Sequence, residues 1–135
     1  MNKLLTDLNL AAPASTQDIA AAETALGFVL PEDFKAFMVA NGAGEGFVGN
    51  HYIILWNVSE LAQFNSEYEF PIYAPSFVAF GSDGGGEAFA FDTRETPPPI
   101  VEVPFIGMSH EDGRRVADNF THLLQRMRDT PESLF

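Results

Sequence analysis

Residues 77–92 read FVAFGSDGGGEAFAFD, in which two short apolar runs stand on either side of a glycine-rich turn. The first run, Phe77 to Phe80, is aromatic and apolar, and the second, Glu87 to Phe91, alternates polar and apolar side chains as a strand does. Glycine takes the positive φ angles of tight turns at little steric cost, so Gly81 to Gly86 suits a hairpin loop. This stretch therefore predicts two antiparallel strands.

Two further apolar runs extend the predicted sheet. Tyr52 to Trp56 is rich in β-branched and aromatic residues, and Ile100 to Val103 follows the stiff turn Pro97-Pro98-Pro99. Between Tyr52–Trp56 and the hairpin, Ser59 to Asn65 suits a short helix. We expect one largely antiparallel sheet built from these four strands.

Longer helices are predicted at the two ends of the chain. Thr16 suits an N-cap and Gly27 a C-cap, which predicts a helix that ends at Ala25 or Leu26. A second helix is expected from Pro31, a favoured first helical residue, to Asn41-Gly42. The closing helix has an apolar face made of Val116, Phe120, Leu123, Leu124 and Met127. The predicted fold class is α+β: one domain over residues 1–135, with its core in 16–128 and the helices packed around the sheet.

The composition limits the classes of protein that fit. The chain has 135 residues, of which 46% are hydrophobic, enough for one core, and it has no cysteine, which excludes disulfides, a thiolate nucleophile and a cysteine zinc site. Asp7 and Asn9 interrupt the apolar N-terminal run, and no segment approaches the roughly 20 apolar residues that span a bilayer. The net charge of −12 argues against a nucleic acid or an anionic lipid surface as partner. We therefore expect a cytoplasmic protein that binds neither nucleic acid nor membrane.

Charge is distributed unevenly along the chain. From Ala36 to Thr93 there is no Lys or Arg, whereas four of the seven basic residues lie near the C-terminus. The carboxylates of the stretch 36–93 belong to Glu45, Glu60, Glu67, Glu69, Asp83, Glu87 and Asp92. A surface of one sign destabilises the fold through self-repulsion and favours fast, selective capture of an oppositely charged partner. The sequence therefore predicts a cationic partner.

No pattern in the chain is typical of a cofactor or metal site. The run Gly44-Glu45-Gly46-Phe47-Val48-Gly49 matches the G-x-G-x-x-G pattern of dinucleotide loops, but it leaves a predicted helix and leads to a strand, so we expect a flexible connection. Asp83, Glu87 and Asp92 lack the spacing of a calcium loop, and we expect solvated loop acids. We therefore predict no metal and no cofactor.

Catalysis is also not indicated by the residue pattern. The histidines His51, His110 and His122 are isolated and lack zinc spacing, and we expect them at the surface. Gly81-Ser82-Asp83-Gly84 is not followed by a helix, so Ser82 lacks the strand-to-helix turn of a nucleophile elbow. We expect no enzymatic activity and no catalytic residue.

A set of ordered motifs resembles a known family. The motifs are Glu23-x-x-Leu26-Gly27-x-x-Leu30-Pro31, Phe34 to Phe37, Asn41-Gly42, Phe80-Gly81-x-Asp83-Gly84-Gly85, Phe91-Asp92 and Asn119-Phe120-x-x-x-Leu124. They resemble the SMI1/KNR4 family, also called the SUKH superfamily, and the resemblance as a whole spans Ile19 to Met127, although Phe34 stands where that family often has Tyr. The resemblance implies an α+β domain without catalytic residues. It also implies a binding role, because bacterial members are viewed as immunity proteins against polymorphic toxins, many of them nucleases, and fungal relatives as interaction proteins in cell-wall and stress signalling.

The combined prediction is a non-enzymatic immunity protein that binds a cognate protein toxin or another basic protein. The predicted binding residues are Trp56, Glu67, Tyr68, Glu69, Asp83, Glu87 and Asp92, which supply carboxylates and aromatic anchors on one acidic surface. A regulatory or scaffold module that binds an endogenous partner is the alternative. The sequence makes no prediction of the oligomeric state.

Overall fold

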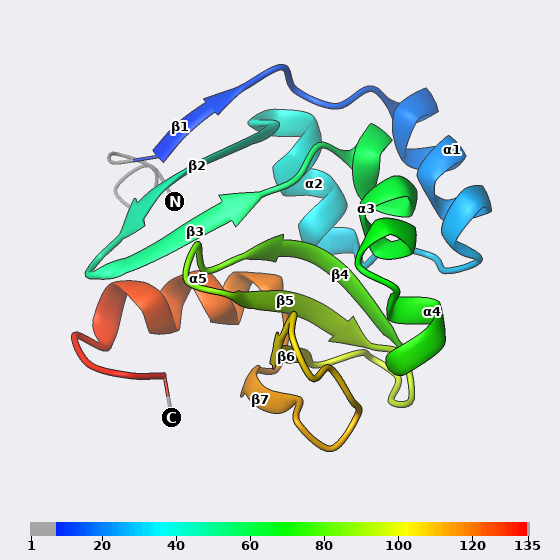
Figure 1. The fold of residues 1–135 in the computed structure, drawn as a ribbon. Helices are drawn as coiled ribbons and strands as arrows, with labels where there is room; N and C mark the ends of the chain where they lie inside the picture. Colours follow the sequence, from blue (N-terminus) through cyan, green and yellow to red (C-terminus); the bar gives the residue numbers. More distant parts are fainter. Residues whose placement is uncertain (1–7, 135) are drawn as a thin grey trace.

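Seven strands form one sheet in the order in which they occur in the chain, and every neighbouring pair is antiparallel. The structure is a computed structural model that describes residues 8–134 (Figure 1). The strands are β1 (Leu8–Ala11), β2 (Ala43–Val48), β3 (His51–Leu55), β4 (Phe77–Ser82), β5 (Glu87–Asp92), β6 (Ile100–Pro104) and β7 (Arg114–Ala117). This confirms the predicted α+β class.

The helices occupy the two predicted regions and the connection between β3 and β4. They are α1 (Thr16–Leu26), α2 (Glu32–Ala40), the short 3₁₀ helix η2 (Val58–Glu60), α3 (Leu61–Glu67), α4 (Phe70–Tyr73) and α5 (Phe120–Asp129). In Figure 1, α2 and α5 lie together behind the sheet, whereas α1, α3 and α4 lie at its right-hand end. Within residues 8–134, no helix has the length and apolar content needed to cross a bilayer.

Local capping explains where the helices begin and end. Ser15, one residue before the predicted Thr16, is the N-cap of α1: its side chain accepts a hydrogen bond from the Asp18 N–H, and the Asp18 carboxylate accepts one from the Ser15 N–H. Gly27 ends α1 with a φ of 66°. Pro31 is the N-cap of α2 and not its first helical residue, so α2 begins at Glu32.

Phenylalanine rings hold the sheet to the helices behind it. The Phe34 ring of α2 lies 5.3 Å from the rings of Phe80 and Phe91, on β4 and β5, and 5.1 Å from that of Phe120 on α5. All four side chains are buried, and their edge-to-face contacts add to the stabilisation from apolar burial. Asp33 also ties the two helices together, because its carboxylate accepts hydrogen bonds from the backbone N–H and the hydroxyl of Thr121.

Two sequence predictions of secondary structure are wrong. Residues 44–49, expected to form a flexible connection, lie mostly in β2, where β1 and β3 supply hydrogen-bonding partners on both sides. Val116, expected on the closing helix, lies in β7, and α5 begins only at Phe120 after the N-cap Asn119 accepts a hydrogen bond from the His122 N–H. Tertiary pairing overrides local preference in both segments.

Candidate partner-binding surfaces

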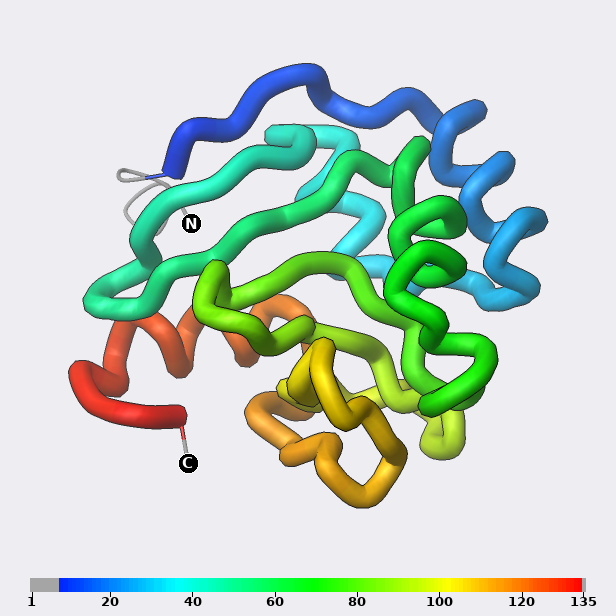
Figure 2. Tube along the Cα trace, in the orientation of Figure 1, coloured from blue at the N-terminus to red at the C-terminus, as the bar shows by residue number. Residues whose placement is uncertain are grey.

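The two faces of the sheet have different surroundings. Side chains alternate between the faces along each strand, and Phe89 and Phe91 point with Phe80 toward α2 and α5. We call this the inner face. On β3, Ile53 and Leu55 are buried, while Tyr52, Ile54 and the following Trp56 alternate with them and lie on the opposite, outer face. Figure 2 shows that no described helix crosses the front of β1 to β3.

An aromatic cluster stands on the outer face where β3 ends. The Trp56 ring stacks on that of Tyr68 at a centroid distance of 5.9 Å and also contacts Phe64 at 4.9 Å. The Phe105 ring lies 4.4 Å from the Tyr68 ring. Trp56 is 9% exposed and Tyr68 44% exposed, so the cluster joins the core to the surface. We call Trp56, Phe64, Tyr68 and Phe105 the aromatic shelf.

Asn65 fixes the helix that carries this shelf. Its buried side-chain amide donates to the carbonyl oxygens of Ala79 and Leu61 and accepts from the Ala79 N–H, each at 2.8 to 2.9 Å. These bonds join α3 to a residue of β4 beside the β-bulge, where register shifts between Ala79 and Gly81. Because the Asn65 amide satisfies both the N–H and the carbonyl of Ala79, it holds α3, with its residue Phe64 and its C-cap Tyr68, against β4.

Two of the predicted carboxylates flank the shelf. Glu67 and Glu69 are exposed on either side of Tyr68, and Gln63 donates a hydrogen bond of 2.9 Å to Glu67. Glu69 has a φ of 63°, a conformation that non-glycine residues rarely adopt. This turn joins α3 to α4 and directs the chain back toward β4.

A groove continues from the shelf across the outer face of the first three strands. It has a volume of about 340 Å³, and we call it the outer groove. It is lined by Ala11, Ala12, Ala43, Gly44, Glu45, Ile54, Leu55, Trp56, Asn57, Glu60 and Phe64. Beyond Glu45, the rings of Phe47 and Tyr52 pack edge to face at 5.0 Å, and the Tyr52 hydroxyl donates a hydrogen bond to Glu45. That hydrogen bond, with some burial, raises the pKa of Tyr52 above its usual value.

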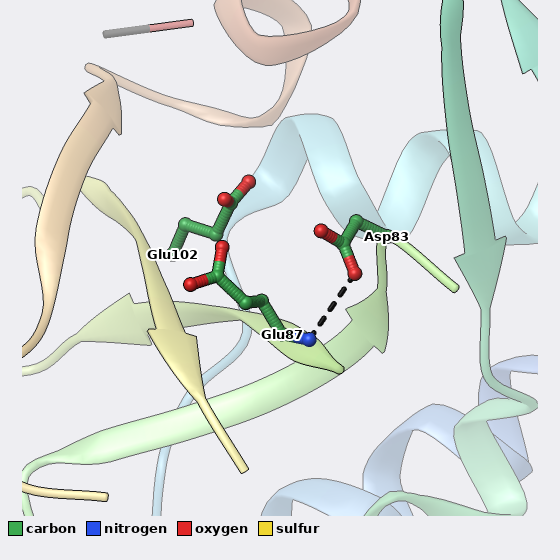
Figure 3. Close-up of side chains that lie close together, drawn as sticks. All are labelled: Asp83, Glu87 and Glu102. Atoms are coloured by element: carbon green, nitrogen blue, oxygen red, sulfur yellow. Dashed lines mark hydrogen bonds between the residues drawn. The ribbon is translucent and has the colours of Figure 1, made fainter. Parts of the chain in front are cut away.

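The hairpin of β4 and β5 gathers three other carboxylates on the inner face. Oxygen atoms of Asp83, Glu87 and Glu102 lie within 4.8 Å of one another, as Figure 3 shows. Asp83 accepts hydrogen bonds from the N–H groups of Gly85 (2.8 Å) and Glu87 (3.1 Å), so its side chain also shapes the turn. We call these three residues the inner triad.

Glu102 reaches the inner triad from β6 through strand pairing. It lies directly opposite Phe89 of β5, and the two side chains therefore share the inner face. A cavity of about 230 Å³ lies beside it, lined also by His51, Met127 and Leu134. Burial first, then a hydrogen bond to Glu87 and the negative charges of Glu87 and Asp83, raise the pKa of Glu102 to about 9, against a smaller opposing effect of Arg114. Glu102 is therefore protonated at neutral pH.

Asp92 lies at the far end of β5 in the opposite environment. It is 5% exposed, and its two oxygens accept hydrogen bonds of 2.9 Å each from the Arg94 guanidinium. This pairing lowers the pKa of Asp92 below its usual value. The Arg94 guanidinium also lies 5.3 Å from the centroid of the Phe77 ring.

The seven predicted binding residues thus fall into three places. Trp56, Glu67, Tyr68 and Glu69 lie together on the outer face, Asp83 and Glu87 lie on the inner face, and Asp92 is buried against Arg94. The expected single acidic surface is divided. Sequence reasoning missed Phe105 and Glu102, and the signal for Glu102 was a carboxylate inside the otherwise apolar run Ile100 to Val103.

The three histidines each form a hydrogen bond with a backbone group. His51 bonds to the Thr130 carbonyl oxygen, His110 accepts from the Ser76 N–H, and His122 accepts from the Asp118 N–H. All three are half-buried, whereas we expected surface positions. The inner triad is the one group of three metal-ligating side chains that the described part of the chain brings close enough to share a cation. The proton on Glu102 would compete with such a cation.

Comparison with known proteins agrees with the motifs. A sequence model described as the SMI1 / KNR4 family (SUKH-1) matches residues 13–126, which includes every motif quoted above. No curated protein matches the chain. The matched region covers α1 to α4, β2 to β7 and most of α5, and β1 lies before it.

Proposed function

Because the chain belongs to the SMI1/KNR4 (SUKH-1) family, we propose that it is an immunity-type protein that binds a cognate, basic polymorphic toxin and blocks it. The family is known for immunity proteins against polymorphic toxins and is generally non-catalytic. A toxin that acts on nucleic acid must hold phosphates with Lys and Arg, so its active face is positive. An acidic protein can occupy such a face and arrive there by electrostatic steering.

The observation that carries this proposal is the one-signed stretch from Ala36 to Thr93, which has seven carboxylates and no Lys or Arg. Glu45, Glu60, Glu67 and Glu69 of this stretch are exposed or half-buried, and none of them forms an ion pair within residues 8–134. Glu67 and Glu69 flank the aromatic shelf, and Glu45 and Glu60 line the outer groove beside it. The shelf supplies an anchor of the kind that dominates binding energy in interfaces. An interface of standard size, about 1,600 Å² in total, would cover this surface.

Binding in place of catalysis is supported by how the polar groups are used. The histidines are engaged by backbone groups, and Ser82, the residue of the predicted hairpin loop, donates to the Glu87 carbonyl oxygen and accepts from the Gly84 N–H. Neither arrangement pairs a nucleophile with a base. The family's non-catalytic character supports the same conclusion.

Co-expression with toxin domains encoded beside the gene tests the proposal. The protein should restore growth of cells that express one of these toxins, and the purified pair should form a complex whose association slows at high salt. Reversal of Glu67 and Glu69, the exposed carboxylates beside the aromatic shelf, to Lys should abolish protection, whereas reversal of the exposed Glu111 and Glu132 should not. Failure to bind or protect against any neighbouring toxin would remove the proposal.

A second candidate, a regulatory or scaffold module for an endogenous partner, is favoured by exposed apolar side chains. Ile106 is 93% exposed and Ile72 is 68% exposed, and an apolar side chain exposed to this degree suits an apolar contact with a partner. A partner held by such contacts should tolerate reversal of Glu67 and Glu69 to Lys. Substitution of Ile72 and Ile106 with Ser should instead weaken its binding.

A further inference from the structure

We propose that the outer groove is the docking site for a basic peptide segment of the partner protein, with an arginine or lysine side chain held beside Glu45 and Glu60 and against Trp56. The inference rests on the proposed function, since it says where and how the basic partner is held. It commits to the outer face and leaves the inner triad out of the interface.

The shape of the groove fits a short segment of polypeptide. Its volume of about 340 Å³ is at the lower end of the range for ligand sites, about 300 to 1,000 Å³. Small residues, Ala43 and Gly44 of β2, together with Ile54 of β3, make an apolar floor. Trp56 and Phe64 form an aromatic wall, so the groove can bury the aliphatic stem of a long cationic side chain.

The charges of the groove are complementary to a cation. Both charged residues that line it, Glu45 and Glu60, are acidic, and the lining contains no Lys or Arg. Each carboxylate accepts a hydrogen bond from a neutral donor, the Tyr52 hydroxyl for Glu45 and the Asn57 amide (3.1 Å) for Glu60. These bonds orient the carboxylates without neutralising them, so both are available to an incoming guanidinium or ammonium group.

The aromatic wall favours the same occupant. Trp56 is 9% exposed and packs on Phe64, which is half-buried, so the wall offers the rim of Trp56 and the Phe64 ring as apolar contact for the stem of an arginine or lysine. Trp56 is also stacked on Tyr68, which is flanked by the exposed Glu67 and Glu69. A segment that leaves the groove along the shelf would therefore meet a second pair of carboxylates. A neutral apolar segment would use the wall and gain nothing from these acids.

A peptide titration tests the site without knowledge of the partner. The probe is acetyl-Gly-Arg-Leu-Arg-Gly-amide, and the control is the same peptide with citrulline, which has the shape of arginine without its charge. Trp56 is the single tryptophan, so its fluorescence reports on the groove wall directly. Added to the full chain, the arginine peptide should shift the amide resonances of Gly44, Ile54 and Asn57 and change the Trp56 emission. The citrulline peptide should bind at least about tenfold more weakly.

Variants and the cognate toxin complete the test. Glu45→Gln with Glu60→Gln should weaken binding of the arginine peptide and of any cognate toxin about tenfold, while the matched pair Glu111→Gln with Glu132→Gln should leave both unchanged. Equal binding of the two peptides, absence of shifts at the groove, or shifts confined to Asp83 and Glu102 would overturn the docking site. A toxin bound equally by the groove variant would overturn the site and leave the immunity function standing. If the arginine peptide binds in the groove but no neighbouring toxin binds the protein, the docking site stands and the immunity function is overturned.

Discussion

Strand β5 has a carboxylate at each end, Glu87 and Asp92, and the surroundings of these two carboxylates are opposite in charge. At Glu87 the chain brings three carboxylates together, and the pKa of Glu102 rises to about 9 because of burial and of its acidic neighbours. At Asp92 the guanidinium of Arg94 donates two hydrogen bonds to the carboxylate and balances its charge, so the pKa of Asp92 falls. Both carboxylates belong to the same acidic stretch of sequence and lie on one strand of six residues.

The difference shows that a run of acidic residues is not equivalent to an acidic surface. Asp92 is neutralised internally, and one proton remains on the inner triad, so neither end of β5 presents its full formal charge. The carboxylates beside the aromatic shelf and the outer groove have no cationic partner within residues 8–134. We therefore propose that the outer face binds the basic protein, and we expect the repulsion within the inner triad to lower the stability of the fold.

Removal of the Asp92 carboxylate should have the largest effect on stability. Asp92→Ala removes a buried carboxylate that accepts three hydrogen bonds, two from the half-exposed Arg94 guanidinium and one from the Arg94 backbone N–H, so the unfolding free energy should fall by about 2 kcal/mol. Urea denaturation at pH 7 measures this change. The exposed Glu111→Ala should stay within about 0.5 kcal/mol of the wild type. A similarly small change for Asp92→Ala would mean that the two ends of β5 do not differ.

Replacement of Glu102, which lies beside the Glu87 end of β5, by a neutral residue should increase the free energy of unfolding. Between pH 4.5, the usual pKa of Glu, and about 9, the unfolded chain ionises Glu102 while the folded chain retains its proton, so stability falls as pH rises. Glu102→Gln should therefore stabilise by about 1 kcal/mol at pH 8, after allowance for solvent screening, and by nothing at pH 4. Urea denaturation at the two pH values, with Glu111→Gln as the control, decides the matter. A loss of stability at pH 8 would contradict the proposed environment.

The fold could be predicted from sequence because its main signals are local. The hairpin at residues 77–92 depends on glycines, and a Cβ at Gly81 would overlap the carbonyl oxygen of Ile54 on β3, so the motif records a close approach of two strands. The boundaries of the closing helix were missed at Val116, since apolar spacing alone fits a strand as well as a helix turn. The cap at Asn119 carried the missing signal.

The site was less predictable because its contacts are distant in sequence. Glu102 meets Glu87 only through the pairing of β5 with β6, and Phe105 meets Tyr68 only once α3 is fixed on the outer face. No periodicity encodes these distances. The pairing of Asp92 with Arg94 was accessible from the sequence, because the first cation after the acidic stretch comes only two residues after its last acid.

The loss of stability at acidic pH should reveal the contribution of the pair formed by Asp92 and Arg94. A carboxylate with a lowered folded pKa contributes stability above its usual value, here 3.8, and loses it as pH falls through the folded value. Asp92→Asn should therefore lose less stability than the wild type between pH 4 and pH 2, by up to about 1 kcal/mol for this pair with a half-exposed arginine. Thermal unfolding across this range measures it. Parallel acid limbs for the two proteins would place the titration elsewhere.

Salt should have the smallest effect and should act oppositely at the two ends. An increase from about 0.01 M to about 0.1 M NaCl shortens the screening length from about 30 Å to about 10 Å, which weakens both the repulsion within the inner triad and the attraction between Asp92 and Arg94. With a net charge of −12, repulsion dominates, and the wild type should gain about 0.5 kcal/mol. The double variant Asp83→Asn with Glu87→Gln should gain less unfolding free energy than the wild type on this increase in salt. Asp92→Asn should gain at least as much as the wild type, and KCl should give the same results as NaCl. Urea denaturation at the two salt concentrations measures these gains. If salt instead destabilises the wild type, the attraction between Asp92 and Arg94 outweighs the carboxylate repulsion of the whole chain.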